Sequence, residues 1–94
     1  MRFVWDESKN RSNQRRHGIS FETATLIFRD PMILSVLDKR YEAIEERWFS
    51  MGLIGDQVIF VAHQAWQEDD SEEIFRIISA RKATLNEERN YYVR

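Results

Sequence analysis

The chain has 94 residues, a formal net charge of −2 and no cysteine. This length predicts a single domain over residues 1–94, and the lack of cysteine excludes disulfides and cysteine-ligated zinc sites. No apolar run approaches the length of a membrane span and no signal-peptide pattern is visible, so we expect no membrane partner and a cytoplasmic location.

The charges are unevenly distributed along the chain. Residues 2–20 and residues 74–94 each carry five basic and two acidic side chains, whereas Glu68 to Glu73 carries five acidic side chains and no base. A local basic patch attracts phosphates whatever the net charge of the chain. The acidic run is either a solvated turn or a docking site for a basic partner.

The first third of the chain predicts a strand and two helices. Arg2–Trp5 is a strand candidate, and Asp6 is a suitable N-cap for a polar surface helix that runs to about Arg16 and ends at His17-Gly18. Ser20 restarts the chain as the N-cap of a second helix. An apolar stripe from Phe21 to Phe28 should pack this helix on a sheet.

Asp30-Pro31 ends the second helix, because the residue before proline disfavours helical backbone. Met32–Leu37 is the next strand candidate, and the charged stretch Asp38–Glu46 is predicted as a loop or a frayed strand edge. The clearest hairpin follows, with strands over Arg47–Ile54 and Gln57–Trp66.

Gly55-Asp56 connects the hairpin in two residues, which favours a primed turn and defines the pairing. In this register Arg47 opposes Gln64 on one face of the sheet, and Trp48 opposes His63 on the other.

The last strand is predicted over Glu73–Ala80, and Thr84 with Glu87 forms a capping box that begins a C-terminal helix. The predicted fold class is therefore α+β, with two N-terminal helices, an antiparallel sheet and a C-terminal helix. If Trp66 faces Ile74, then Gln64 faces Arg76, and strict alternation turns Arg81 to the opposite face.

Arginine is the residue type that carries most of the candidate chemistry. Guanidinium groups bind phosphates bidentately and suit a pentacoordinate phosphorane, as formed in metal-free RNA cleavage. Arg81 is the strongest candidate, because it stands where a strand ends and a helix begins. Arg47 and Arg76 are equally compatible with edge arginines paired to Glu46 or Glu73.

The chain contains two histidines, too few for a multi-histidine metal site, and we expect no metal and no cofactor. His63 is a candidate proton-transfer group, although a packed histidine opposite Trp48 is the simpler interpretation. His17 fits the C-terminal turn of its helix. Phosphate contacts without sequence preference are possible at Arg15, Arg16, His17, Lys82 and Arg89.

Several segments in the same order make the chain similar to the BrnT family. They are Phe3-Val-Trp-Asp6, Arg16-His-Gly-Ile-Ser-Phe-Glu22, Phe28-Arg-Asp-Pro31, Glu45-Glu-Arg47 with Met51-Gly-Leu53, Arg76-Ile-Ile-Ser-Ala-Arg81, Glu87-Glu-Arg89 and Tyr91-Tyr92. The resemblance implies the toxin of a type II toxin–antitoxin pair, with a RelE-like fold and a ribonuclease activity that arrests translation. Carried over by position, its basic residues would be Arg47, Arg76 and Arg81, with His17 and His63 as further matches.

The resemblance also implies a partner. This would be a BrnA-type antitoxin with a ribbon-helix-helix domain, in a 2:2 complex that binds operator DNA through the antitoxin. Two departures are the acidic run Glu68 to Glu73 and a C-terminal helix with few basic residues. Two other functions stay open on the sequence: a non-catalytic module that acts by binding a protein partner, and direct DNA binding by this chain.

Overall fold

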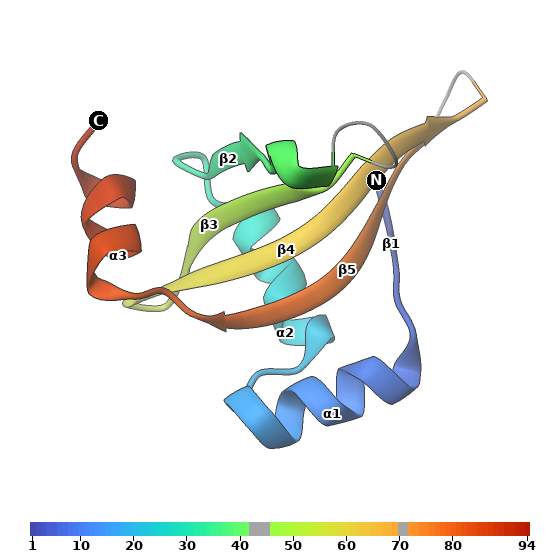
Figure 1. Ribbon diagram of the computed structural model, residues 1–94, viewed down its shortest axis with the longest axis horizontal. Helices are drawn as coiled ribbons and strands as arrows, with labels where there is room; N and C mark the ends of the chain where they lie inside the picture. The colour runs from blue at the N-terminus through green and yellow to red at the C-terminus, as the bar shows by residue number, and fades with distance from the viewer. Residues whose placement is uncertain (42–45, 70–71) are drawn as a thin grey trace.

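Five strands form one sheet in the order β1-β5-β4-β3-β2 in the computed structural model, which describes residues 1–41, 46–69 and 72–94 (Figure 1). The strands are β1 (Arg2–Val4), β2 (Leu34–Leu37), β3 (Trp48–Ile54), β4 (Gln57–Glu68) and β5 (Glu72–Lys82). The helices are α1 (Glu7–His17), α2 (Phe21–Ala24) and α3 (Leu85–Tyr92), with 3-10 segments η1 (Thr25–Arg29) and η2 (Lys39–Tyr41). Residues 42–45 and 70–71, which belong to the predicted loop and to the acidic run, lie outside the described part.

The helix boundaries follow from the predicted caps. The Asp6 side chain accepts a hydrogen bond from the Lys9 amide, and Gly18 ends α1 with φ of 74°. The Ser20 side chain caps α2. Thr84 and Glu87 form the complete capping box at the start of α3. Each cap satisfies backbone amides that have no partner within their own helix.

The second helix departs from the prediction. Only Phe21–Ala24 is α-helical, and the chain then tightens into the 3-10 turn Thr25–Arg29. The Thr25 hydroxyl donates to the carbonyl of Glu22 at 2.6 Å, where it competes with regular helical bonding. Phe21, Ala24 and Ile27 are nevertheless fully buried against the sheet, as the apolar stripe predicts.

The α+β class and the C-terminal helix are confirmed, but the predicted arrangement needs two corrections. The two predicted N-terminal helices reduce to α1 and a single α-helical turn over Phe21–Ala24, and the sheet is mixed rather than antiparallel, although the predicted N-terminal strand is present as β1. β1 pairs in parallel with β5, placing Phe3 beside Phe75, while the other strand pairs are antiparallel. A strand of three residues carries too little sequence pattern to show its partner or direction.

The β3–β4 hairpin has the predicted register. Gly55 adopts φ of 64° in the two-residue turn, and Trp48 opposes His63. Gly52 is required for close packing rather than for its backbone conformation. A Cβ atom there would lie 2.8 Å from the Cβ of Ile27, so the missing side chain lets η1 pack directly on β3.

The pairing of β4 with β5 contains a β-bulge that the sequence does not announce. Arg76 opposes Gln64 and Ile77 opposes His63, yet Ser79 opposes Ala62, which leaves Ile78 without a partner on β4. One extra residue reverses the alternation beyond it. The prediction for Arg81 was therefore wrong: it opposes Phe60 and shares a face with Arg76.

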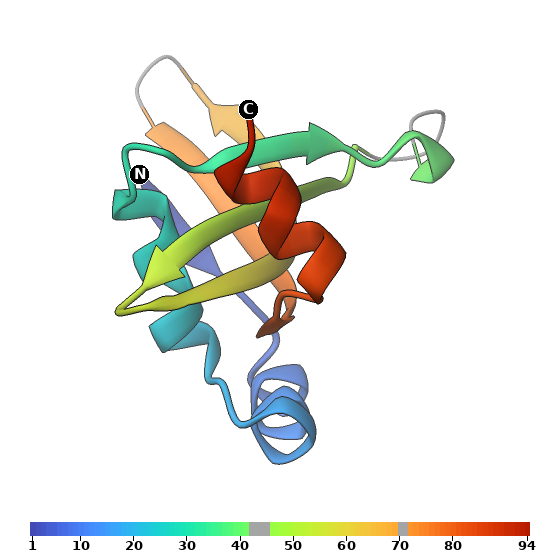
Figure 2. The same cartoon turned by 90° about the vertical axis from the view of Figure 1, so that its left-hand side faces the viewer.

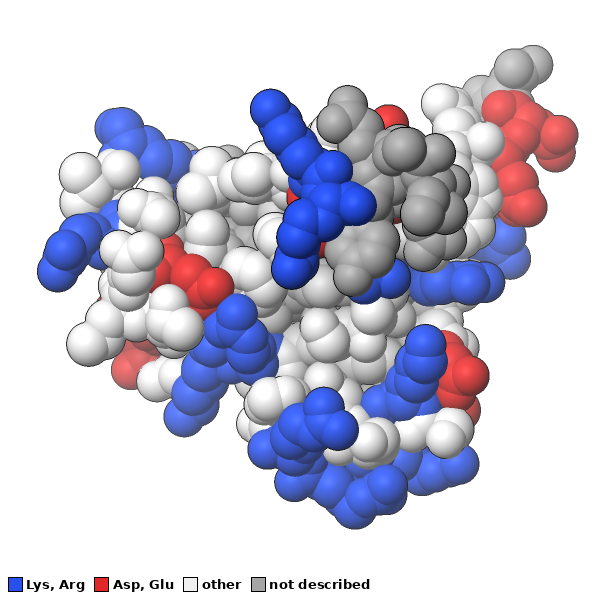
Figure 3. Space-filling view, in the orientation of Figure 1, with Lys and Arg blue, Asp and Glu red and all other residues white. Residues whose placement is uncertain are grey.

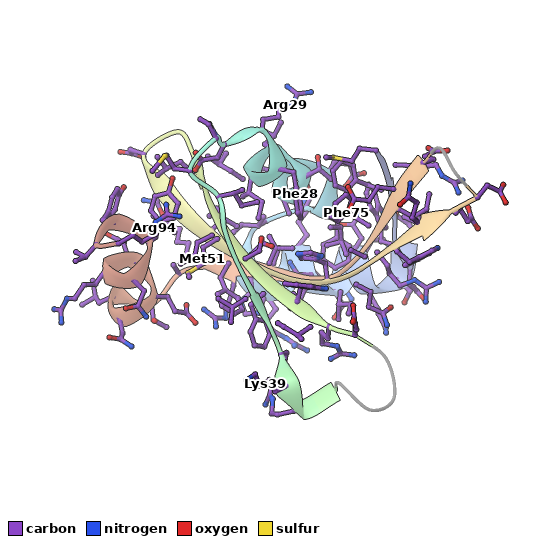
Figure 4. The ribbon with its side chains drawn as sticks, turned by 90° about the horizontal axis from the view of Figure 1, so that it is seen from above. Phe28, Arg29, Lys39, Met51, Phe75 and Arg94 are labelled. Carbon is purple, nitrogen blue, oxygen red and sulfur yellow. The ribbon has the colours of Figure 1, made fainter. Side chains whose placement is uncertain are left out.

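The sheet has two different faces. We call the face packed by α2 and η1, with α1 beneath its β5 edge, the covered face (Figures 1 and 2). The side chains of Phe28 and Phe75 lie on this side, and Lys39 lies beyond the other side (Figure 4). We call that other side the open face. The C-terminal helix α3 covers one end of it, where Tyr91 packs with Met51 and Val58.

Candidate functional site

Arg81 lies on the open face at the junction of β5 and α3. Its guanidinium lies 4.3 Å from the centroid of the Phe60 ring. It also donates to both carboxylate oxygens of Glu87, at 2.8 and 3.0 Å. Planar stacking and a bidentate ion pair together give this arginine a single orientation. Its side chain remains 34% exposed, so a ligand can still reach it.

The Arg81–Glu87 pair perturbs both of its members. The hydrogen bonds from Arg81 lower the pKa of Glu87, and the same bonds raise the pKa of Arg81. Glu87 is also the acidic residue of the α3 capping box, since it accepts from the Thr84 amide at 2.8 Å. The Glu87 carboxylate therefore links the N-terminal cap of α3 to the Arg81 guanidinium.

Arg76 lies further along the same face. Its guanidinium is 6.0 Å from the Trp66 ring, and its side chain is exposed. Arg76 and Arg81 oppose β4 residues four positions apart, which is roughly 13 Å along the strand at about 3.3 Å per residue. Long arginine side chains at this separation can bind one short stretch of a polyanion.

A basic groove joins Arg76 to helix α1. Arg76 and Lys9 line a hollow of about 330 Å³ that also touches the bulged Ile78. Lys9 and Arg16 line a second hollow of about 240 Å³ next to it. Because Lys9 borders both, cations extend from the open face around the β5 edge. Figure 3 shows Lys and Arg side chains around the open face and along α1 below it.

Arg47 and Arg40 lie near the opposite edge of the sheet. Arg47 is half-buried just before β3, and its carbonyl accepts from the Asp38 amide at 2.7 Å. Arg40 pairs with Asp38 at 2.8 Å and lies 5.9 Å from the Phe49 ring. The pKa of Asp38 is lowered, first by the hydrogen bond from Arg40 and also by the charge of Arg47.

His63 lies on the covered face and is only 3% exposed. Its ring packs against Phe28 and Phe75, with centroids 5.1 and 5.7 Å away. The Nε2 atom is 2.6 Å from the Ser50 hydroxyl, which is 2.7 Å from the Ser35 hydroxyl. Burial lowers the pKa of His63 to about 4, so the ring is neutral at neutral pH. Arg76 and Arg81 are on the other side of the sheet.

The other predicted phosphate contacts are scattered. Arg15, Arg16 and His17 are exposed in the last turn of α1, and only Arg16 borders the basic groove. Lys82 is exposed and opposes Ile59, so its side chain is directed away from the face of Arg81. Arg89 is exposed on α3. Apart from Arg16, none of these residues lines the basic groove that continues from Arg76.

Reading the sequence missed four residues of this region. Glu87 was recognised only as a helix cap. Phe49 and Phe60 looked like ordinary strand residues, although the hairpin register already placed both on the face of Arg47. Lys9 lies seven residues before Arg16, a spacing that puts both on one side of α1. The acidic run has a partner within the chain, since Arg2 contacts Glu68 at 3.0 Å.

The arrangement has the chemistry of an anion site. Fixed guanidinium groups on an accessible sheet can hold phosphate oxygens and stabilise added negative charge. Among the described residues, no three His, Asp or Glu side chains gather as metal ligands would. In the same part of the chain, no helix has the length and apolar character needed to cross a membrane.

Comparison with known protein families gives a match over most of the chain. Residues 5–87 fit the family model described as "Ribonuclease toxin, BrnT, of type II toxin-antitoxin system". The match begins just after β1, spans strands β2 to β5 and reaches the beginning of α3, and thus includes both Arg76 and Arg81. Among curated proteins, none matches the chain.

Proposed function

Because the chain belongs to the BrnT family of ribonuclease toxins of type II toxin–antitoxin systems, we propose that it is an endoribonuclease whose reaction takes place on the open face of the sheet. The observation that carries this location is the bulge at Ile78, which brings Arg76 and Arg81 to the same face. We propose further that cleavage needs no metal ion and arrests translation. That the fold is similar to that of RelE remains a prediction.

The chemistry that fits these residues is attack of the RNA 2′-hydroxyl on the adjacent phosphorus, with loss of the 5′ oxygen. The phosphorane formed on the way carries more negative charge on its oxygens than the starting phosphodiester. Arg81, held by Glu87 and Phe60, would bind that charge in a preset orientation. Removing one such donor in other enzymes lowers kcat by about 10²–10³.

Arg76 and Arg47 have supporting roles in this proposal. Arg76 is exposed and stacks loosely on Trp66, which suits a phosphate contact next to the scissile group. Arg47 lies close to the carboxylate of Asp38, near the other edge of the open face. Lys9 and Arg16 would guide the RNA chain along the α1 groove. Phosphate contacts of this kind position the substrate and carry little sequence preference.

His63 enters the proposal as a structural residue. A general acid or base works best with a pKa near the working pH, and it must reach the proton that it transfers. The pKa of His63 lies near 4, its ring is buried, and its Nε2 atom is engaged with Ser50. Its contacts join β4 to β3 and η1 beneath the arginines.

A cognate antitoxin of the BrnA type is the expected partner, in a 2:2 complex that binds operator DNA through the antitoxin. An inhibitor of the proposed site has to neutralise or cover the open-face arginines. Acidic side chains on the antitoxin would meet that requirement, because opposite charges steer association and exclude the competing phosphate.

The test is RNA cleavage by the purified chain in EDTA. We expect the wild type to cleave, and the double variant Arg76→Ala with Arg81→Ala to lose the activity. Arg11→Ala is the matched control, since Arg11 is exposed on α1. Full cleavage by the double variant would contradict the location of the site, and cleavage that needs added divalent ions would contradict metal independence. Growth inhibition that survives the double substitution would favour a non-catalytic interaction module.

A further inference from the structure

Two phenylalanines occupy the open face between the arginines. The Phe49 and Phe60 rings lie 5.0 Å apart, tilted by 37°. The guanidinium of Arg81 stacks on Phe60, and that of Arg40 lies 5.9 Å from Phe49. We infer that this aromatic pair is a stacking site for an unpaired base of the RNA substrate. The inference rests on the proposed function, because it assigns a base subsite beside the proposed reaction centre.

Core packing does not fully explain the two rings. Phe60 borders the small cluster beneath α3, but Phe49 belongs to neither of the two core clusters in the described part of the chain. Both are half-buried rather than enclosed. Single-stranded nucleic acids are bound by such combinations, in which aromatic rings take the bases and neighbouring cations take the phosphates.

The geometry favours Phe49 as the primary stacking surface. Arg81 already covers Phe60 at 4.3 Å and is held there by Glu87. Arg40 lies farther from its ring, and its side chain is 73% exposed. A base can therefore enter between Phe49 and Arg40 when the exposed Arg40 guanidinium moves outward, which gives up part of its two-bond pair with the Asp38 carboxylate. Arg81 then remains in place for the neighbouring phosphate.

This arrangement selects for unpaired RNA. A base within a duplex has its faces covered by its neighbours, so it cannot lie flat on Phe49. Stacking is tolerant of sequence because every base offers a π face. The inference therefore predicts a preference for single strands over duplexes, and it assigns no recognition sequence.

The experiment measures binding separately from cleavage. The probe is a fluorescent single-stranded RNA oligonucleotide with 2′-O-methyl sugars, in which the attacking hydroxyl is blocked, and its Kd is measured by anisotropy. Phe49→Leu removes the π face while it keeps an apolar side chain. We expect it to weaken single-strand binding by roughly 5- to 140-fold, which corresponds to the range measured for loss of one stacked base. Binding of an abasic oligonucleotide should not change.

Val36→Ala is the control, since Val36 opposes Phe49 on β2 and is exposed. It should leave the Kd unchanged. An equal Kd for wild type and a folded Phe49→Leu variant would overturn the stacking site, even if the wild type cleaves RNA. Loss of binding to single-stranded and abasic probes alike would overturn it too. Wild-type protein that binds single strands through Phe49 but cleaves no RNA would support the stacking site and contradict the proposed activity.

Discussion

The two faces of the sheet differ in the burial and the hydrogen-bond partners of their polar groups. On the covered face, Asn13 bonds to the backbone of Ile19 and Ala80, and His63 bonds to Ser50. These groups are buried, and their bonds are made within the chain. On the open face, Arg81 has an internal partner but stays accessible, and Arg76 is exposed. Polar groups under the helices therefore stabilise the fold, whereas polar groups on the open face remain available to a ligand.

The largest expected effect comes from Arg81→Ala. Loss of this preset cation should reduce kcat/KM for RNA cleavage by about 10²–10³, because no other described side chain stacks on Phe60 while paired to Glu87. Arg81→Lys keeps the charge but loses the planar, bidentate contact, and should recover only part of the rate. Initial rates with Arg11→Ala as the control measure this. A wild-type cleavage rate for folded Arg81→Ala would contradict the proposal that Arg81 on the open face takes part in the reaction.

The covered face predicts a loss of stability rather than of activity. His63→Ala removes a ring packed on Phe28 and Phe75 and takes away one of the two hydrogen-bond partners of the Ser50 hydroxyl, the other being Ser35. We expect the free energy of unfolding to fall by about 2–4 kcal/mol. Urea denaturation measures it. The cleavage rate per folded molecule should stay near the wild-type value. A large loss of cleavage by the folded variant would show that the covered face also takes part in the reaction.

The same histidine predicts a pH dependence. Its pKa is about 4 in the folded chain and about 6.5 when unfolded, so the unfolded state binds more protons between these values. The free energy of unfolding should therefore decrease as the pH falls from about 6.5 to about 4, by up to roughly 3 kcal/mol. His63→Leu should flatten this part of the curve. An unchanged slope in that variant would mean that His63 has the same pKa in the folded and the unfolded chain.

A smaller effect is expected from Glu87→Gln, which tests the role of the carboxylate beside Arg81 on the open face. The substitution removes a negative charge beside the proposed phosphate site and weakens both the Arg81 pair and the α3 cap. Stability should fall by about 1 kcal/mol, as for the loss of a helix cap. Affinity for non-cleavable RNA should rise. Glu88→Gln, next to it on α3, is the control, and weaker RNA binding by Glu87→Gln alone would show that Glu87 helps to bind the substrate.

Local signals in the sequence predicted much of the fold. The side chains of Asp6, Ser20 and Thr84 cap their helices through contacts within a few residues. The two-residue turn at Gly55 defined every pair of the β3–β4 hairpin. Such features depend on neighbours in the chain, so a single sequence is enough to find them. The parallel partner of β1 depends on a strand some 70 residues away, and no local pattern encodes it.

The candidate site was less predictable, for one physical reason. Alternation along β5 placed Arg76 and Arg81 on opposite faces, and the bulge at Ile78 put them on the same one. Nothing in Ile77-Ile78-Ser79 marks a bulge, since no glycine or proline interrupts the strand. The stacking of Arg81 on Phe60 follows from the shifted register, so it was hidden as well. His63 could be recognised as a packed residue, because the hairpin register alone predicts that it lies opposite Trp48.

The most direct test of the central claim compares the two faces in one assay. Single-turnover RNA cleavage is measured in EDTA at neutral pH for Arg76→Ala with Arg81→Ala and for His63→Gln, with the folded state of each verified by circular dichroism. We expect the arginine variant to lose cleavage while folded His63→Gln cleaves at close to the wild-type rate. Loss of cleavage in folded His63→Gln, with activity retained by the arginine variant, would contradict it.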